Sequence, residues 1–393
     1  MKRRQFAAVL GATALPPIGA WPASAEAPSG CGVPMARRDG WAVAAVDGDA
    51  LVDHDALCRL ADRLAVLGDP NVHAVVVARD GKLVFERYFK GADQVPGPMV
   101  GLFGPQVKTV AFDADTLHNL KSVSKSVASL VVGIALDRGL IRSVDEPIFN
   151  FFPELADLHT PEKDRILLRH VLTMTLGLKW VEAAPATEKD NDESRMHMAA
   201  DPCRYVLGLT PTAPPGQAFF YNTGALTLVS AIVRKATGRP LDEFARTTLF
   251  EPLGITDFEW RRVRGDSDAG GGLRLRPRDM AKIGQLVLAG GRSNDQQIVS
   301  SAWIEASTTP KIEATDEQLY GYLWWLGRVN AGGRVVRWIG AQGRGGQYIR
   351  VVPELDLVVA VTAGYYQDYS VQAFRTQFGV FRDVVRAAMS SRS

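Results

Sequence analysis

Ser122 and Lys125 are the residues of this sequence whose types and spacing most directly suggest chemistry. Residues three apart lie on one face of a helix, so the side-chain nitrogen of Lys125 can reach the hydroxyl of Ser122. A serine with a lysine as its proton acceptor is one form of activated nucleophile. Burial and neighbouring cations lower the pKa of a lysine, so we expect Lys125 to be neutral near pH 7 and to accept the serine proton.

The segment around this pair predicts a buried helix over residues 122–138. Apolar residues return with helical spacing from Val123 onward, and Gly139 follows where a helix would end. Lys125 occupies the position at which a capping box would have Glu or Gln, and a cation in the first turn is unfavourable there. A residue that is unfavourable for the local structure, as Lys125 is here, indicates a functional site. The alternative is a core helix whose first serine is only a cap.

Residues 1–25 have the pattern of an export signal. Lys2, Arg3 and Arg4 form a charged start, an apolar stretch follows over 6–18, and residues 23–25 are a small-x-small cleavage site. The two arginines resemble a twin-arginine signal, and an ordinary secretory signal is the alternative. The apolar stretch is too short to remain as a spanning helix. We therefore expect a periplasmic or secreted protein without a stable membrane anchor.

The net charge bears on the class of binding partner, and the cysteine count bears on disulfides. The formal net charge of the chain is +2, and removal of the three positive charges of the signal leaves −1, so a nucleic-acid partner is not indicated. Cys31, Cys58 and Cys203 are an odd number without a C-x-x-C pair, which allows one disulfide but argues against a disulfide framework. The sequence does not select a pair.

Hydrophobic patterning predicts strands at both ends of the chain and helices between them. We expect a surface stretch at 26–50, a helix over 53–67, a β-hairpin at 72–77 and 82–88 across Asp80-Gly81, and a loop over 91–113. Helical patterns follow at 166–176, 225–237, 241–249 and 277–288, then strands at 321–329, 334–339, 347–352 and 355–363 and a helix over 370–389. This order predicts an α+β fold in which an antiparallel sheet from N- and C-terminal segments is flanked by helices. We divide the chain into a signal (1–25), an N-terminal extension with the first helix (26–69) and one hydrolase domain (70–389) with a mostly helical lobe at about 140–310.

Other catalytic signatures are missing. The sequence has no G-x-S-x-G elbow, and all six histidines occur at or before His197, which excludes a hydrolase order with a late histidine. The histidines also lack H-E-x-x-H or other close ligand spacing, so we interpret them as structural or surface residues. We expect neither a metal nor an organic cofactor.

Residues 116–127, which contain Ser122 and Lys125, resemble the active-site segment of the β-lactamase-related serine hydrolases. That family includes class C β-lactamases, D-alanyl-D-alanine carboxypeptidases and 6-aminohexanoate-dimer hydrolases. Residues 169–178, 249–255 and 270–291 are similar to further family segments in the same order, the last being nearest to the 6-aminohexanoate-dimer hydrolase and esterase-like branch. The resemblance covers roughly 70–385. It implies a β-lactamase/transpeptidase-like fold and catalysis through an acyl-enzyme.

The family's second motif is Tyr-x-Asn, and residues 221–223 occupy its place. By resemblance, Tyr221 shares the proton transfer with Lys125, first helping to deprotonate Ser122 and then protonating the leaving group. Thr223 stands where the family has Asn, so it is the expected substrate contact at that position. A packed aromatic residue is the alternative interpretation of Tyr221.

The third motif is Lys-Thr-Gly on a strand beside the nucleophile, and residues 343–347 are similar to it. We place Arg344 at the cationic position, where it would bind a substrate carboxylate, and Gly346 at the glycine. The backbone N–H groups of Ser122 and Gln347 would then form the oxyanion hole. A glycine-rich hairpin bend is the alternative interpretation.

The sequence therefore predicts an exported serine hydrolase that acts on esters or amides of small acids, with a small-molecule substrate as its partner. The nearest alternative is a D-alanyl-D-alanine carboxypeptidase or a β-lactamase. An alternative of another class is a non-catalytic penicillin-binding-like scaffold, which the joint presence of Ser122, Lys125 and Tyr221 disfavours. The oligomeric state is not indicated.

Overall fold

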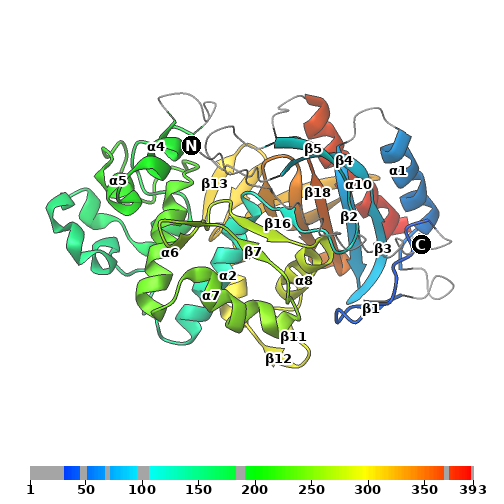
Figure 1. The fold of residues 1–393 in the computed structure, drawn as a ribbon, viewed down its shortest axis with the longest axis horizontal. Helices are drawn as coiled ribbons and strands as arrows, with labels where there is room; N and C mark the ends of the chain where they lie inside the picture. Colours follow the sequence, from blue (N-terminus) through cyan, green and yellow to red (C-terminus); the bar gives the residue numbers. More distant parts are fainter. Residues whose placement is uncertain are drawn as a thin grey trace, which may run out of the picture.

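A nine-stranded sheet joins the two ends of the chain in the computed structural model (Figure 1). The structure describes residues 31–44, 51–66, 71–95, 106–182, 191–366 and 371–390, so the predicted signal lies outside the described residues. The strands β2 (Val72–Arg79) and β3 (Lys82–Tyr88) form the hairpin predicted from Asp80-Gly81, and β1 (Ala42–Val43) runs parallel to β3.

The C-terminal strands complete this sheet on the other side of β2. The strand β18 (Leu357–Ala363) pairs with β2, and the sheet continues through β17 (Gln347–Val352), β16 (Arg334–Gly343), β15 (Trp325–Ala331), β14 (Gln318–Tyr320) and β13 (Ile312–Thr315), all antiparallel. The prediction of one antiparallel sheet from N- and C-terminal segments is confirmed.

Helices cover both faces of the sheet. On one face, α1 (His54–Val66) and α10 (Val371–Ser390) lie over a cluster that includes Val75, Val77 and Val359. On the other face, α8 (Pro277–Leu288) contacts β2 and β18, and α2 (Val123–Asp137) contacts β16 and β17, over a second cluster that includes Val76 and Ala360. Because β2 and β18 are buried on both faces, both strands are unbroken runs of mostly Val and Ala, without the alternation of a half-exposed strand.

The region between the two halves of the sheet is mostly helical, as predicted (Figure 1). Its helices are α3 (Leu168–Leu172), α4 (Asp192–Met198), α5 (Pro202–Gly208), α6 (Gly224–Thr237), α7 (Leu241–Ala245) and α9 (Ser301–Thr308), with 3-10 turns at Ile148–Phe151, Pro153–Leu158, Lys163–Arg165 and Glu251–Leu253. Short strands accompany them. The strands β6 (His118–Asn119), β10 (Leu273–Leu275) and β7 (Glu259–Trp260) form a small sheet, and β8 (Arg262–Val263) pairs with β9 (Asp266–Ser267) and β11 (Arg292–Ser293) with β12 (Gln296–Gln297).

Three local predictions differ from the structure. The loop expected over 91–113 is wrong in part, because β4 (Lys90–Val95) and β5 (Gln106–Ala111) form a two-stranded antiparallel ribbon; residues 96–105 are not described. The helix expected over 166–176 has only five residues, since Met174 has a left-handed backbone with φ of 58°. The helix expected over 241–249 ends at Ala245 and continues as one π-helical turn, Arg246–Phe250.

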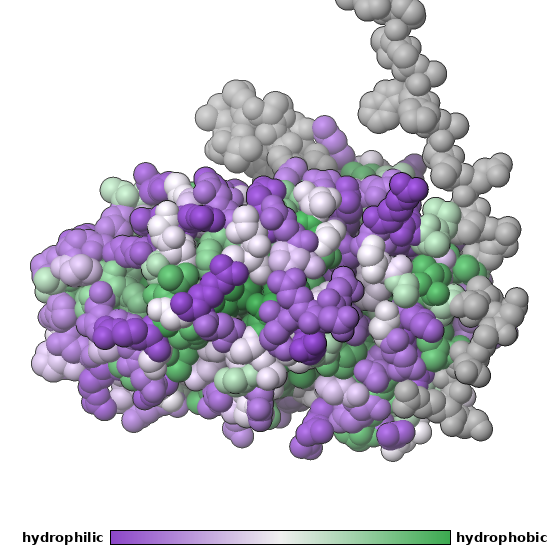
Figure 2. Space-filling model, turned by 90° about the horizontal axis from the view of Figure 1, so that it is seen from below, coloured by the Kyte–Doolittle hydropathy of each residue, from purple (hydrophilic) through white to green (hydrophobic). Residues whose placement is uncertain are grey.

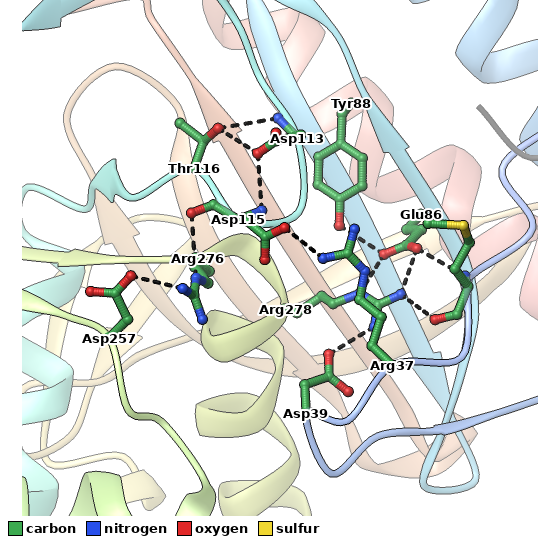
Figure 3. A network of polar contacts seen from close by, with 11 residues as sticks. Arg37, Asp39, Glu86, Tyr88, Asp113, Asp115, Thr116, Asp257, Arg276 and Arg278 are labelled. Carbon is green, nitrogen blue, oxygen red and sulfur yellow. Dashed lines mark hydrogen bonds and ion pairs between the residues drawn. The ribbon is translucent and has the colours of Figure 1, made fainter. Parts of the chain in front are cut away.

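An ion network holds the N-terminal segment 31–44, part of the stretch that we expected to run freely over the surface (Figure 3). The guanidinium of Arg278, on α8, donates to both carboxylate oxygens of Glu86 at 2.6 and 2.7 Å. It also donates to the Asp39 carboxylate and the Met35 carbonyl, each at 2.7 Å. Because both residues belong to this segment, one buried arginine connects the segment to β3 and α8.

A disulfide makes a second attachment of this segment. Cys31 and Cys58 are bonded across a Cα–Cα separation of 5.7 Å, which joins the segment to α1. Cys203 is a free thiol. The structure thus selects the pair that the sequence left open.

No helix among the described residues is long and apolar enough to cross a membrane. The face drawn in Figure 2 is largely hydrophilic, with smaller apolar areas between the polar side chains.

Candidate active site

The first turn of α2 places Ser122 at the edge of a large cleft. Ser122 is the N-cap of the helix, yet its side chain makes no capping bond, so its hydroxyl is not used to end the helix. Lys121, just before it, has a left-handed backbone with φ of 50°, and the Asn119 side chain accepts a hydrogen bond from the Lys121 N–H at 3.0 Å. A non-glycine residue in this conformation is strained, and such strain gathers at functional sites.

Lys125 lies one helical turn later and contacts the predicted nucleophile. Its Nζ donates to Ser122 Oγ at 2.8 Å and to the Gly270 carbonyl at 2.7 Å. The side chain is buried, with 2% of its surface exposed. The structure therefore brings Ser122 and Lys125 together as their spacing predicts.

The neighbouring serines have structural partners instead. Ser124 Oγ donates to the Lys121 carbonyl at 2.6 Å and accepts from the Leu273 N–H at 3.1 Å. Ser126 Oγ donates to the Leu323 carbonyl at 2.6 Å. Both hydroxyls connect α2 to surrounding backbone, whereas the hydroxyl of Ser122 faces Lys125 and the cleft.

Tyr221 approaches Lys125 from the segment that precedes α6. The centroid of its ring lies 5.1 Å from Lys125 Nζ. The ring stacks on Trp325 of β15, with 6.0 Å between centroids and 24° between planes. Both Tyr221 and Trp325 line the cleft, so the sheet and the helical region each contribute one wall.

The charge of Lys125 differs from our expectation. Burial of the ammonium lowers its pKa, but the charges of Tyr221, Glu182 and Glu193 and a hydrogen bond with Tyr221 raise it by more, so the pKa of Lys125 is raised overall. The prediction of a neutral lysine near pH 7 is therefore wrong for the free protein. Burial and the nearby Glu182 also raise the pKa of Glu193.

Thr223, the expected substrate contact, makes its polar contacts with Glu182. The Thr223 N–H and hydroxyl donate to the two oxygens of that carboxylate at 2.8 and 2.6 Å. Trp180 Nε1 donates to the same carboxylate at 2.7 Å. Thr223 does line the cleft, but its hydroxyl is directed to Glu182, and a direct role toward substrate stays a prediction.

The glycine-rich hairpin between β16 and β17 meets the cleft through Gln342, Gly343 and Arg344. A Cβ on Gly343 would lie only 2.3 Å from the Leu120 carbonyl oxygen, so glycine lets the end of β16 approach the backbone two residues before Ser122. Gly346 and Gln347 are buried and do not belong to the lining of the cleft, so the roles assigned to them toward substrate stay predictions. Gln347 accepts from the Ala363 N–H at 2.9 Å through its side chain, which ties it to β18.

Arg344 itself lies at the mouth of the cleft, as its predicted role requires. It is exposed, and its Nε donates to the Tyr366 carbonyl at 2.7 Å. Lys121 lies nearby, with Nζ 4.7 Å from the centroid of the Tyr366 ring. Burial and the charges of Arg261 and Arg344 lower the pKa of Lys121. This edge of the cleft is thus positively charged.

The cleft also contains groups that the sequence did not reveal. Its volume is about 1780 Å³, and the Gly270 carbonyl, Glu182 and Glu193 surround the buried ammonium of Lys125. These residues lie far from the three motifs in sequence. The glycine run Gly270-Gly271-Gly272 was the available signal, since such a run allows a backbone to approach closely.

This architecture is a β-lactamase/transpeptidase-like fold. A penicillin-binding protein homologue from Caulobacter crescentus has the same fold, with a TM-score of 0.63 and 18% identity over 86% of this chain and 97% of that chain. The beta-lactamase family model matches residues 71–370. The chain therefore belongs to the beta-lactamase family.

Two named relatives are similar to this chain over different shares of its length. The 6-aminohexanoate-dimer hydrolase of Paenarthrobacter ureafaciens is 26% identical over 90% of this chain and 87% of its own length. Esterase EstB of Burkholderia gladioli is 29% identical over 46% of this chain and 45% of its own length.

Proposed function

We propose that the protein is an exported serine hydrolase that acts through an acyl-enzyme on esters or amides of small acids. The observation that carries this proposal is the 2.8 Å contact from Lys125 Nζ to Ser122 Oγ, at the start of a buried helix and at the edge of the cleft. The relatives that hydrolyse an amide dimer or bear the name esterase support the same class of substrate.

The reaction begins with attack of Ser122 Oγ on the substrate carbonyl carbon, and the serine proton passes to the Lys125–Tyr221 pair. Because the Lys125 ammonium has no lone pair, the acceptor of this proton is the Tyr221 oxygen in its phenolate form, with the ammonium of Lys125 beside it as the counter-charge. The pair then protonates the departing alcohol or amine. Water repeats the sequence on the acyl-enzyme, which releases the acid and restores Ser122.

The tetrahedral intermediate needs two donors to its oxyanion. The Ser122 N–H is one, and the other belongs to residues 342–344 at the end of β16, since this part of the hairpin lines the cleft. Each preorganised donor contributes about 3–4 kcal/mol to stabilisation of the transition state. The close contact of Gly343 with the Leu120 carbonyl supports the short separation that such a pair of donors requires.

Export rests on the signal pattern of residues 1–25 and on the Cys31–Cys58 disulfide. Disulfides persist in the periplasm and outside the cell and are rare in reducing compartments. The twin-arginine pattern favours transport through that route, and fusion of residues 1–30 to a reporter in strains lacking either pathway would test it.

The hydrolase proposal is tested by intact-protein mass spectrometry. The protein is incubated with a fluorophosphonate, p-nitrophenyl esters, 6-aminohexanoate oligomers and penicillins, and the adduct is mapped to a residue. We expect fluorophosphonate and short acyl adducts on Ser122, with turnover of esters or amides. A stable penicillin adduct with little ester turnover would favour the cell-wall peptidase or β-lactamase class. Absence of every adduct would favour a non-catalytic scaffold and contradict the proposal.

A further inference from the structure

Three side chains that can bind a metal ion lie together behind the wall of the cleft. They are His73 on β2, Asp93 on β4 and His118 on β6, and each is buried, with 0%, 4% and 0% of its surface exposed. Their ligand atoms all lie within 4.8 Å of one another. None of the three lines the cleft, so the group is separate from the residues of the proposed reaction.

The position of the proton on His73 follows from Asn71. The Asn71 amide is fixed on both sides by Ala92, because its Nδ2 donates to the Ala92 carbonyl at 2.9 Å and its Oδ1 accepts from the Ala92 N–H at 2.8 Å. The same Oδ1 lies 2.9 Å from His73 Nε2. Since that oxygen can only accept, Nε2 of His73 carries hydrogen, and Nδ1 of the neutral ring carries a lone pair.

The same reasoning applies to His118. Its Nδ1 lies 3.1 Å from the Asn119 carbonyl oxygen, which can only accept, so Nδ1 carries hydrogen and Nε2 carries the lone pair. Yet His73 Nδ1 and His118 Nε2 lie only 2.7 Å apart. Two lone pairs facing one another at this distance repel, so a positive centre has to lie between them.

Asp93 adds the negative group that such a centre needs. Tyr366 donates its hydroxyl to Asp93 Oδ1 at 2.8 Å, which orients the carboxylate and leaves its other oxygen available. Each of the three side chains therefore has an outer partner that fixes its orientation: Asn71, the Asn119 carbonyl and Tyr366. Histidine ligands in metal sites regularly donate their second nitrogen to such partners.

We propose that His73, Asp93 and His118 bind a divalent transition-metal ion, with zinc as the best fit to two imidazoles and one carboxylate. Zinc–nitrogen bonds of about 2.0–2.1 Å in a tetrahedron separate two nitrogens by about 3.3 Å. The two rings therefore need to move apart by roughly 0.6 Å from their present 2.7 Å contact. Three protein ligands leave a fourth position for a further ligand.

The ion would connect β2, β4 and β6. Since β6 ends at Asn119, which lines the cleft and accepts from the N–H of Lys121, the ion anchors the segment that leads into the nucleophile. This is a structural role, and it does not depend on the proposed hydrolase activity. The two histidines are 45 positions apart in the sequence, which explains why their spacing carried no metal signature.

Metal content tests the proposal. The purified protein is stripped with a chelator, dialysed against Zn²⁺ and then against metal-free buffer, and its zinc is measured by inductively coupled plasma mass spectrometry. We expect about one zinc per chain, a melting temperature that rises with added Zn²⁺, and visible d–d bands when Co²⁺ replaces it. Asp93→Asn and His118→Gln should weaken zinc binding at least 10-fold. His159→Gln is the matched control, because His159 is an exposed histidine beside the carboxylate of Asp164.

Two results would overturn the metal site. The first is a folded wild-type protein that retains less than a tenth of one zinc per chain and whose melting temperature does not change when Zn²⁺ is added. In that case the rings of His73 and His118 share a proton instead of a metal ion. If zinc binds equally to the wild type and to both variants, the ion lies elsewhere. Because these readouts do not involve substrate, they remain distinct from any failure of the hydrolase proposal.

Discussion

Lys125 and Arg278 are two buried cations with different kinds of hydrogen-bond partner. Arg278 is saturated by carboxylates, with both oxygens of Glu86 and one of Asp39 as acceptors (Figure 3). Lys125 gives its hydrogen bonds to a hydroxyl and a carbonyl, while Glu182 and Glu193 act on it through space. The first arrangement holds a charge permanently in place. The second leaves the charge beside groups that change protonation, which is what a proton-transfer site needs.

The largest expected effect is that of Ser122→Ala. Removal of the nucleophile should lower turnover by something like 10⁴–10⁶-fold and abolish the acyl-enzyme adduct, with the fold intact because the hydroxyl makes no cap. Kinetics with a p-nitrophenyl ester and intact mass spectrometry check both. The matched control is Ser126→Ala, which leaves the Leu323 carbonyl without its donor and should cost about 1–3 kcal/mol of stability while the adduct still forms. An adduct on the Ser122→Ala protein would contradict the assignment.

The next effect is that of Lys125→Met, which keeps similar bulk and removes the charge. Loss of the proton-transfer partner should lower kcat by about 10²–10⁴-fold, as measured by single-turnover acylation. Lys125→Arg should also be nearly inactive, because a planar guanidinium does not reproduce the two hydrogen bonds of the buried ammonium, to Ser122 Oγ and to the Gly270 carbonyl. Near wild-type acylation in the Arg variant would mean that only positive charge is needed at this position.

The raised pKa of Lys125 makes a prediction about pH. The folded protein binds this proton more tightly than the unfolded chain, so the contribution to stability is fully present below the ordinary lysine pKa of 10.5 and is lost as pH rises through the raised value. Lys125 should therefore cause no rise in acylation rate between about pH 6 and 9. If the acylation rate rises within this pH window and the rise disappears in Lys125→Arg, the result would support the hypothesis that neutral Lys125 is the base.

Arg278→Met tests the other side of the comparison. It leaves Glu86 buried without its partner and should lower the free energy of unfolding by about 3–5 kcal/mol, measured by denaturant titration. Arg276→Met, which breaks the more exposed pair with Asp257, should cost less than about 1 kcal/mol. Both variants should keep wild-type kcat per folded molecule, since neither residue lines the cleft. A large fall in kcat for either would mean that the ion network also shapes the site.

Arg344 is a third kind of cation, exposed at the mouth of the cleft, and its variant should have the smallest effect. Arg344→Ala should raise KM for acid-ended amides such as 6-aminohexanoate dimers by about 10–100-fold and leave neutral short esters nearly unaffected. Steady-state kinetics on the two substrates checks this. Equal losses on both would assign Arg344 a structural role through its bond to the Tyr366 carbonyl.

Long periodic segments were predictable from sequence because one residue pattern determined them. The helix α2 and the β2–β3 hairpin agree closely with their predicted bounds. The ribbon of β4 and β5 was missed because its residues are largely polar and Gly91 indicates a turn when read alone.

In the site, the local Ser122–Lys125 spacing was sufficient to predict their contact, whereas other features depend on distant residues. The pKa of Lys125 is set by Tyr221, Glu182 and Glu193, which the fold brings in from other segments. Residues 343–346 contain three glycines, so spacing alone did not indicate which of them meets the cleft.

The pairing of β2 with β18 also determines when the protein can fold during its synthesis. The strand β2 leaves the ribosome before the whole helical region, yet its partner β18 is made only after that region. Until Leu357–Ala363 has emerged, one edge of β2 has no strand to pair with, and a non-local pairing of this kind forms slowly. A stop codon shortly before Leu357 would therefore remove the middle of the sheet and leave two incomplete pieces with unpaired, aggregation-prone edges.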